Sequence, residues 1–371
     1  MNKENGYPSS RLFCLDALRG LDMILLIVIG RLFRACNGVF HFPEPFARQF
    51  DHAWGEFTLW DIIMPLFIFM CGAAIPFALP KRLDAEGRPT AAFWKHVFGR
   101  VALLWVLGML CQGFLAKLDL MWINPYSNTL QAIAAGYLIA ALVLIVPGRI
   151  GRVARWATPI VLAGGYALLM HFCGDYTKEG NFPQIVEHAI RVRLLPAGSD
   201  AISNWGYTWF LTTMMFGAMT LCGMNATDIL RGAGSKGAKA AKLFGLGAAL
   251  LAVGWAVTPW VPMIKHVYTF SFTAQAMGWC VLALAVLYVV NDIWMCRRGW
   301  GLVLLYGQYA LWAYMIGECF GNVVDAFSER ITMGFPHVFG AAMALPLTEL
   351  VSVCAITACL MLRHVLKRKM S

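Results

Sequence analysis

The sequence predicts an all-α integral membrane protein, a bundle of about ten transmembrane helices with both chain termini in the cytoplasm. Hydrophobic residues make up 59% of the 371 positions and charged residues only 13%, whereas soluble domains carry about a quarter charged residues. Apolar runs of about 20 residues, the length that crosses a bilayer, recur along the whole chain. Lys and Arg gather in alternate connecting segments. We therefore expect one transmembrane domain over residues 1–371.

Ten apolar segments are long enough to cross a bilayer. They lie near 16–36, 58–79, 94–115, 128–147, 156–173, 206–224, 243–260, 269–290, 300–319 and 338–363. The segments between them are polar or rich in Gly and Pro. No inverted internal repeat, of the kind that builds many secondary transporters, is visible.

The basic residues fix the expected orientation. With ten spans, one side of the membrane receives Lys81, Arg82, Arg88, Arg149, Arg152, Arg155, Arg231, Lys236, Lys239, Lys242, Arg297, Arg298 and the basic C-terminal tail. The positive-inside rule places that side in the cytoplasm. The opposite side then carries 37–57, 116–127, 174–205, 261–268 and 320–337. We expect 174–205 to be an extracytoplasmic loop with a short amphipathic helix near 182–194, acting either as a lid or as a connector.

The net charge of +10 does not indicate nucleic-acid binding, because the topology explains where the basic residues lie. The 11 Cys fall mostly within apolar runs and lack metal-site spacing, so neither a metal site nor a disulfide framework is expected. The first apolar segment contains Asp16, Arg19 and Asp22, unlike the apolar region of a cleavable signal peptide.

These three charges of the first span fall at i, i+3 and i+6. They lie along a helix face broad enough for Arg19 to contact both carboxylates. An exposed salt bridge is one interpretation. A buried network facing the bundle is favoured, because charges at this depth must find partners inside the protein.

The stretch FDHAWGEFTLWDIIMPLFIFMCG (50–72) carries the strongest indication of chemistry. His52 lies just before an apolar run and Asp61 at its beginning, which suits a general base and the acid that orients its ring. His52 as a loop histidine bonded to backbone is the alternative. Trp54 suits the aromatic belt at a membrane interface, and we count it as a substrate-binding candidate.

Other polar or helix-perturbing residues lie within the spans. Pro65 is tolerable there because neighbours can satisfy the freed carbonyl, and Gly72 permits close helix contact. Glu318 and Asn322, spaced i, i+4 at the outer end of the ninth span, either form interhelical hydrogen bonds or contact substrate.

Five segments resemble, in order, the heparan-α-glucosaminide N-acetyltransferase family and its bacterial relatives. They are LDALRGLDM (15–23), HAWGEFTLWDIIMPLFIFMCG (52–72), NTLQAIAAGYLIAAL (128–142), YTFSFTAQAMGWCVLALAVLYVVND (268–292) and YGQYALWAYMIGE (306–318). The resemblance covers most of the chain. One difference is that the family's Asn toward the outer end of the first span is matched by Gly30, with Arg31 next.

The resemblance implies a multispan acyltransferase of the bacterial cytoplasmic membrane. Members take acetyl-CoA from the cytosol and acetylate a sugar amine on the far side. His52 matches the catalytic His and Asp61 the acidic residue after it. The remaining candidates are Gln131 for substrate and Asp16, Arg19, Arg82, Arg100 and Arg149 for acetyl-CoA, the last three because cytoplasmic basic residues suit its phosphates.

We therefore expect a transmembrane acetyltransferase that uses cytosolic acetyl-CoA and an extracytoplasmic acceptor, either an amino sugar such as terminal glucosamine or another envelope glycan. His52 acts as a general base or carries the acetyl group itself. The alternative is a proton-coupled transporter or flippase of a glycan-related substrate. The expected partners are acetyl-CoA, the acceptor and the bilayer, without nucleic acid. The oligomeric state stays open, with a homodimer among the arrangements allowed.

Overall fold

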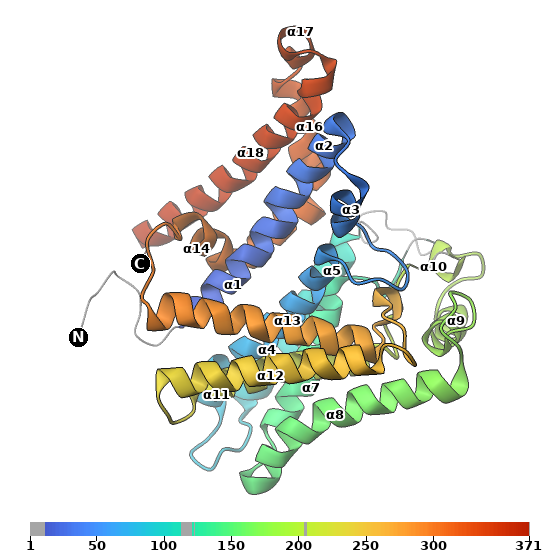
Figure 1. Cartoon of the computed structure of the whole chain (residues 1–371), viewed down its shortest axis with the longest axis vertical. Coiled ribbons are helices and arrows are strands. Elements are labelled where there is room, and N and C mark those ends of the chain that lie inside the picture. The colour runs from blue at the N-terminus through green and yellow to red at the C-terminus, as the bar shows by residue number, and fades with distance from the viewer. Residues whose placement is uncertain (1–11, 113–120, 122, 204–205, 371) are drawn as a thin grey trace. The chain divides into compact units, whose positions relative to one another are not determined.

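A computed structural model describes residues 12–112, 121, 123–203 and 206–370, and within this part of the chain it contains helices and turns but no strand. The all-α class is therefore confirmed. The chain divides into two compact units (Figure 1). Unit 1 comprises Met1–Ala47, Gly234–Ala241 and Leu282–Ser371, and unit 2 comprises Arg48–Ala233 and Lys242–Val281. The expectation of one domain stays a prediction.

Unit 1 is organised around the first and last helices of the chain. α1 and α2 form one continuous helical segment through a π-helical turn, and α18 packs against α2, α16 and α17 while α14 packs against α1. Gly307 of α14 allows that close approach, because a Cβ there would overlap the backbone oxygen of Asp16. The elements are α1 (Phe13–Ile24), the π turn Leu25–Ile29, α2 (Gly30–Phe40), α3 (Glu44–Ala47), α14 (Gly301–Gln308), α15 (Ala310–Tyr314), the π turn Met315–Cys319, α16 (Gly321–Ile331), α17 (Phe335–Phe339) and α18 (Ala341–Met370).

Unit 2 is built around α11, which packs against α4, α7 and α8, with α5 against α7. Gly72 of α4 faces the Thr220 carbonyl of α11, and Gly223 of α11 faces the Phe69 carbonyl of α4, so closely that a Cβ on either glycine would overlap the backbone. The expected close contact at Gly72 is confirmed. The elements are α4 (Ile63–Ala78), α5 (Ala91–Cys111), α7 (Thr129–Leu144), α8 (Gly148–Cys173), α9 (Phe182–Leu194), α10 (Asp200–Ser203) and α11 (Thr213–Arg231). Two further helices, α12 (Lys236–Val257) and α13 (Phe270–Tyr288), have residues in both units.

Six helical segments among the described residues are long and apolar enough to cross a membrane. They are Leu59–Ala78, Ala91–Cys111, Gly148–Cys173, Lys236–Val257, Phe270–Ile293 and Ala341–Lys369. Each matches one of the expected spans, although residues 113–115 of the span expected near 94–115 lie outside the described part of the chain. The structure therefore supports a membrane protein.

The other four expected spans are helical but short, charged or interrupted. The segment near 128–147 gives the 16-residue α7, and the segment near 300–319 is interrupted at Tyr309 between α14 and α15. α11 begins at Thr213 rather than near 206. Ten spans and cytoplasmic termini stay predictions.

The amphipathic helix expected near 182–194 is confirmed as α9, Phe182–Leu194. Its start is set by Asn181, whose side chain accepts a hydrogen bond from the backbone N–H of Gln184 at 2.9 Å, and by Pro183 in the first turn, both common helix-start features. Of the connecting segment expected over 116–127, residues 116–120 and 122 lie outside the described part.

Candidate functional site

His52 and Asp61 lie in unit 2, where a loop leads into α4. The Nδ1 atom of His52 lies 2.6 Å from the Oδ1 atom of Asp61. Asp61 is fully buried, whereas the His52 side chain is 29% exposed. The predicted pairing is present, and it leaves the imidazole partly accessible.

The loop before α4 holds this pair by hydrogen bonds within itself. The Oδ2 atom of Asp61 accepts the backbone N–H of Thr58 at 2.9 Å. The Thr58 hydroxyl in turn donates to the Asp51 carbonyl at 2.8 Å, next to His52. With its second oxygen fixed in this way, Asp61 accepts from Nδ1–H of His52, and we assign the tautomer that leaves Nε2 unprotonated.

Pro65, expected to disturb the span, lies at the third position of α4. The 3-10 turn Leu59–Ile62 runs directly into α4, so the missing N–H of Pro65 falls where the chain passes from that turn into the α-helix.

Lys265 completes a cluster that the sequence analysis did not include. Its Nζ atom lies 3.0 Å from Nε2 and 3.1 Å from Nδ1 of His52, and 3.4 Å from Oδ1 of Asp61. The residue is only 4% exposed. A signal was available, since 261–268 was expected on the same side of the membrane as 37–57, and a buried Lys requires a partner.

The turn that carries Lys265 is anchored at three successive backbone positions. Tyr268 adopts a left-handed conformation and its N–H closes the turn onto the Lys265 carbonyl at 3.0 Å. The His266 carbonyl accepts from the Thr208 N–H at 3.1 Å, and the Val267 carbonyl accepts from the Tyr166 hydroxyl. These anchors place the ammonium group at the imidazole.

An aromatic stack lies beside the cluster. The ring of His266 stacks on Tyr207, with centroids 4.8 Å apart, and on Trp54, with centroids 5.4 Å apart. Tyr207 also meets the His52 ring edge-to-face at 6.3 Å. Trp54, a predicted substrate contact, is thus part of a wall next to His52. We call Trp54, His266 and Tyr207 the aromatic wall.

Burial shifts the titration of both residues on this turn. It lowers the pKa of Lys265 to about 8, although the Asp61 carboxylate opposes the shift. It also lowers the pKa of His266 to about 4, and the charge of Lys265 acts in the same direction. His266 is therefore neutral at pH 7, whereas the pKa of Lys265 lies much closer to neutral pH than that of an ordinary lysine.

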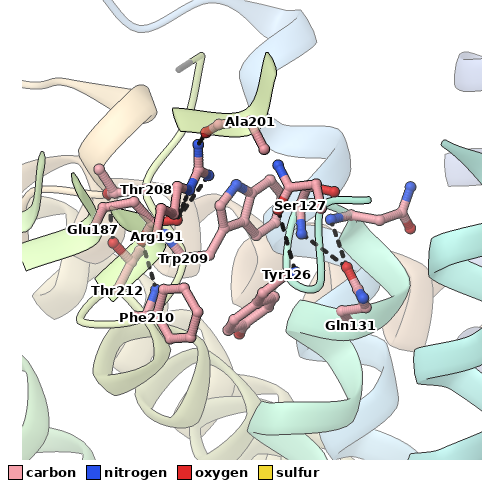
Figure 2. A network of polar contacts seen from close by, with 12 residues as sticks. Tyr126, Ser127, Gln131, Glu187, Arg191, Ala201, Thr208, Trp209, Phe210 and Thr212 are labelled. Carbon is pink, nitrogen blue, oxygen red and sulfur yellow. Dashed lines mark hydrogen bonds and ion pairs between the residues drawn. The ribbon is translucent and has the colours of Figure 1, made fainter. Parts of the chain in front are cut away.

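α9 clamps the segment that carries Tyr207 (Figure 2). One carboxylate oxygen of Glu187 accepts the backbone N–H groups of Trp209 and Phe210, each at 3.0 Å. The other accepts Arg191 at 2.8 and 3.1 Å, and Arg191 donates onward to the Ala201 carbonyl at 2.6 Å. We call this set the α9 clamp. Because it occupies the N–H groups of Trp209 and Phe210, it explains why α11 begins later than expected.

Gln131, a predicted substrate ligand, is fully buried and bonds to backbone (Figure 2). Its side-chain oxygen accepts the N–H groups of Ser127 and Asn128 at 2.8 and 3.0 Å, and its nitrogen donates to the Pro125 carbonyl at 2.7 Å. With Asn128 it forms a capping box that starts α7. This geometry assigns Gln131 a structural role and offers no support for a substrate contact.

Four of the other predicted site residues, Asp16, Arg19, Glu318 and Asn322, lie in unit 1. Glu318 and Asn322 line a cavity. Arg19 pairs with Asp16 at 3.2 Å. Arg19 does not form the expected bond to Asp22, whose carboxylate is buried and has no hydrogen-bond partner among the described residues. The Arg19 side chain is 27% exposed, so it extends toward the surface rather than toward that buried acid.

The predicted acetyl-CoA contacts Arg82 and Arg100 lie in unit 2. Arg82 donates to the Ala78 carbonyl at the end of α4, and Arg100 lies 4.7 Å from the Tyr137 ring centroid. The Tyr137 hydroxyl and Nε2 of His96, one helical turn before Arg100, are buried without a hydrogen-bond partner in the described part of the chain. Two guanidinium groups beside unsatisfied polar atoms suit an anionic group. Arg149 is exposed at the start of α8.

Residues 11–150 match the family model of a domain of unknown function, DUF5009. The matched part contains His52, Asp61 and the capping box at Gln131, and it ends before Lys265. No curated protein sequence matches the chain.

Proposed function

We propose that this chain is a transmembrane acetyltransferase that moves an acetyl group from cytosolic acetyl-CoA to an extracytoplasmic sugar, with His52 as the general base. The observation that carries the proposal is the His52–Asp61 pair, 2.6 Å apart, beside Lys265 and the aromatic wall. Ten spans, cytoplasmic termini and a bacterial cytoplasmic membrane belong to the same proposal.

The proposed chemistry uses the orientation of the His52 ring. The acceptor amine or hydroxyl attacks the thioester carbonyl, a C–N or C–O bond forms, and the C–S bond breaks. Nε2 of His52 takes the proton of the acceptor and passes it to the CoA thiolate, while Asp61 stabilises the transient imidazolium. Transfer through an acetyl-imidazole at His52 stays open as the second route.

Lys265 controls when this base is available. As an ammonium it lies 3.0 Å from Nε2, the atom that must receive the acceptor's proton. A proton on His52 would then lie beside a second positive charge, and the two repel. We therefore place the active form of the site with Lys265 neutral.

This role predicts a pH dependence. Since burial lowers the pKa of Lys265 to about 8, turnover should rise with pH through about 8 as the ammonium loses its proton. Lys265→Met should lose that ascending limb while keeping some activity at pH 7. The measurement is the initial rate of acetyl transfer from pH 6 to 9. Titration of the acceptor itself affects both proteins alike, so two profiles of the same shape would contradict the role.

The acyl donor would run along α4. Asp61 and Arg82 lie in the short 3-10 turns just before and just after this helix, roughly 30 Å apart at 1.5 Å per residue, about the thickness of the hydrocarbon core. Phosphates held near Arg82 and Arg100 would leave the pantetheine arm to extend between the helices toward His52.

The test of function is direct. Purified full-length protein is incubated with acetyl-CoA carrying a labelled acetyl group and with a panel of amino sugars and envelope glycans, and the label on each sugar is measured. We expect transfer to at least one sugar amine or hydroxyl. A well-folded protein that labels none of them would overturn the proposal.

The rival function, proton-coupled transport, is favoured by one observation: Lys265, His52 and Asp61 are three coupled titratable groups within 3.4 Å of one another. Such clusters also form proton relays in transporters. Acetyl transfer discriminates between the two, because a transporter would move a glycan across liposomes without labelling it.

The orientation is testable by cysteine labelling. In a background without the 11 native Cys, Glu179→Cys and Lys236→Cys each place one thiol at an exposed position. An impermeant thiol reagent added to intact cells should label position 179, and position 236 only after the membrane is opened. Labelling of both from the same side would exclude the proposed topology.

A further inference from the structure

Unit 1 contains a cavity of about 420 Å³, a size typical of small-molecule sites. Six polar residues line it: Arg31, Arg34, Glu318, Asn322, Asp325 and Glu349. We call it the unit 1 cavity. Glu349 belongs to Ala341–Lys369, a helix long and apolar enough to cross a membrane, and an ionisable residue in such a helix is a functional-site candidate because its desolvation is costly.

Arg31 forms the fixed part of the cavity wall. One guanidinium nitrogen lies 2.6 Å from the Asp325 carboxylate and 3.2 Å from that of Glu349, and the other donates to the Gly317 carbonyl at 3.1 Å. The Arg31 side chain is 12% exposed. Both terminal nitrogens of Arg31 thus already donate to protein groups, so Arg31 is poorly suited to bind an anionic ligand.

The backbone around the cavity contains two π turns and two closely packed glycines. The π turns Leu25–Ile29 and Met315–Cys319 meet where Gly317 packs on Ile27, so closely that a Cβ on Gly317 would overlap the Ile27 side chain. A Cβ on Gly321 would approach the Arg31 guanidinium to 2.9 Å. π turns are rare and occur frequently at functional sites. Here two π turns, together with Gly317 and Gly321, let the backbone pack closely around Arg31.

The charges of the lining are unequal. Three carboxylates (Glu318, Asp325, Glu349) face two guanidinium groups, and Arg31 pairs directly with two of the carboxylates. The Glu318 carboxylate forms no hydrogen bond or ion pair among the described residues, although the charges of Arg34 and Arg31 act on it. Asn322, one turn further along the chain, lies on the same wall. The formal excess is therefore one negative charge, with Glu318 as the acceptor that the protein leaves open.

We propose that the unit 1 cavity binds the primary ammonium group of a small hydroxylated molecule, with Glu318 pairing the ammonium and Asn322 bonding a hydroxyl. A free amino sugar and the headgroup of an ethanolamine phospholipid share this chemistry. The proposal does not depend on acetyl transfer at His52.

The experiment measures ligand binding with a reporter thiol placed in the cavity itself. Leu345 lines it and is exposed, so Leu345→Cys in a background without native Cys reports occupancy by the rate of thiol modification. Glucosamine is added to protein in phosphatidylcholine nanodiscs, with glucose and N-acetylglucosamine as probes that lack the ammonium. A separate arm replaces part of the phosphatidylcholine with phosphatidylethanolamine.

We expect protection by glucosamine or by phosphatidylethanolamine, which identifies the source, and none by glucose or N-acetylglucosamine. Adding Glu318→Gln should weaken protection at least about tenfold in concentration, because a charge-assisted hydrogen bond is lost. The matched control is Glu329→Gln, an exposed acid of α16 outside the lining, which should keep protection.

If the background without native Cys does not fold, equilibrium dialysis of labelled glucosamine with the native-Cys protein replaces it, again comparing Glu318→Gln with Glu329→Gln. Phosphatidylethanolamine is then titrated separately as its labelled short-chain form. Three outcomes would overturn the proposal. Glucose could protect or bind as well as glucosamine does, Glu318→Gln could leave protection or binding unchanged, or neither amine could protect or bind at all.

Discussion

Replacing His52 by Ala should lower the rate of acetyl transfer at least about 10²-fold, within the 10²–10⁴-fold range of general-base catalysis. The change removes Nε2, the atom that takes the acceptor's proton. It also removes any acetyl-imidazole route, so both proposed chemistries predict the loss. The measurement is turnover of labelled acetyl-CoA at saturating acceptor.

The fold should tolerate this change, because the His52 side chain is 29% exposed and little apolar area is lost. His188→Ala is the matched control, since His188 is exposed on α9 and forms none of the contacts of the site. Acetyl-CoA binding should persist in both variants if the phosphates lie near Arg82 and Arg100. A folded His52→Ala protein with wild-type turnover would remove His52 from the mechanism.

Asp61→Asn gives a graded comparison. The amide keeps the shape of the side chain, and its oxygen can still accept a hydrogen bond from His52. It removes the negative charge that stabilises a protonated imidazole and that lies 3.4 Å from Lys265. We expect a smaller loss than for His52→Ala, measured in the same assay, and no loss would show that orientation alone suffices.

The sequence allowed the His52–Asp61 pair to be predicted because the two residues are close in the chain and flank the start of one span. Lys265 is 213 residues from His52. The expected loop topology places His52 and Lys265 on one side of the membrane. Their contact also depends on the anchored turn that carries Lys265 and on the rotamer of the Lys265 side chain. Neither hydropathy nor charge pattern encodes those two features.

Gln131 shows the opposite case, because its structural role is encoded locally in the sequence. Asn128 and Gln131 have the spacing of a capping box, which predicts a helix start from sequence. The family resemblance, by contrast, implies a substrate contact at this position. A buried side-chain amide is expected to bond to nearby backbone groups before it serves a ligand, because an unpaired N–H in the protein interior costs about 1–3 kcal/mol.

The start of α11 was beyond sequence reasoning for a different reason. The apolar pattern continues through 206–212, so hydropathy extends the helix to that point. The backbone there is held by Glu187, more than 20 residues earlier, through the N–H groups of Trp209 and Phe210. A tertiary hydrogen bond therefore overrides the local preference and leaves Tyr207 on an irregular segment facing His52.

The α9 clamp should accordingly be a structural element of unit 2 that is sensitive to substitution. Glu187 is 1% exposed and Arg191 3% exposed, and burial raises the pKa of Glu187 against the opposing effect of Arg191 and the two backbone N–H groups. The ionised carboxylate is thus tolerated only because these partners surround it. Removing it would leave a buried guanidinium without its acid and two N–H groups without acceptors.

Glu187→Ala should therefore destabilise the protein by about 3–5 kcal/mol, the usual cost of breaking a buried ion pair on one side, measured as a fall in the thermal unfolding midpoint in detergent. Glu179→Ala, which removes an exposed acid of the same loop, should change the midpoint little. Acetyl transfer should fall with Glu187→Ala even below the unfolding transition, because Tyr207 loses its fixed position. The double variant Glu187→Leu with Arg191→Leu should recover part of the stability, since it removes both charges together. An unchanged midpoint for Glu187→Ala would show that the clamp does not hold this segment.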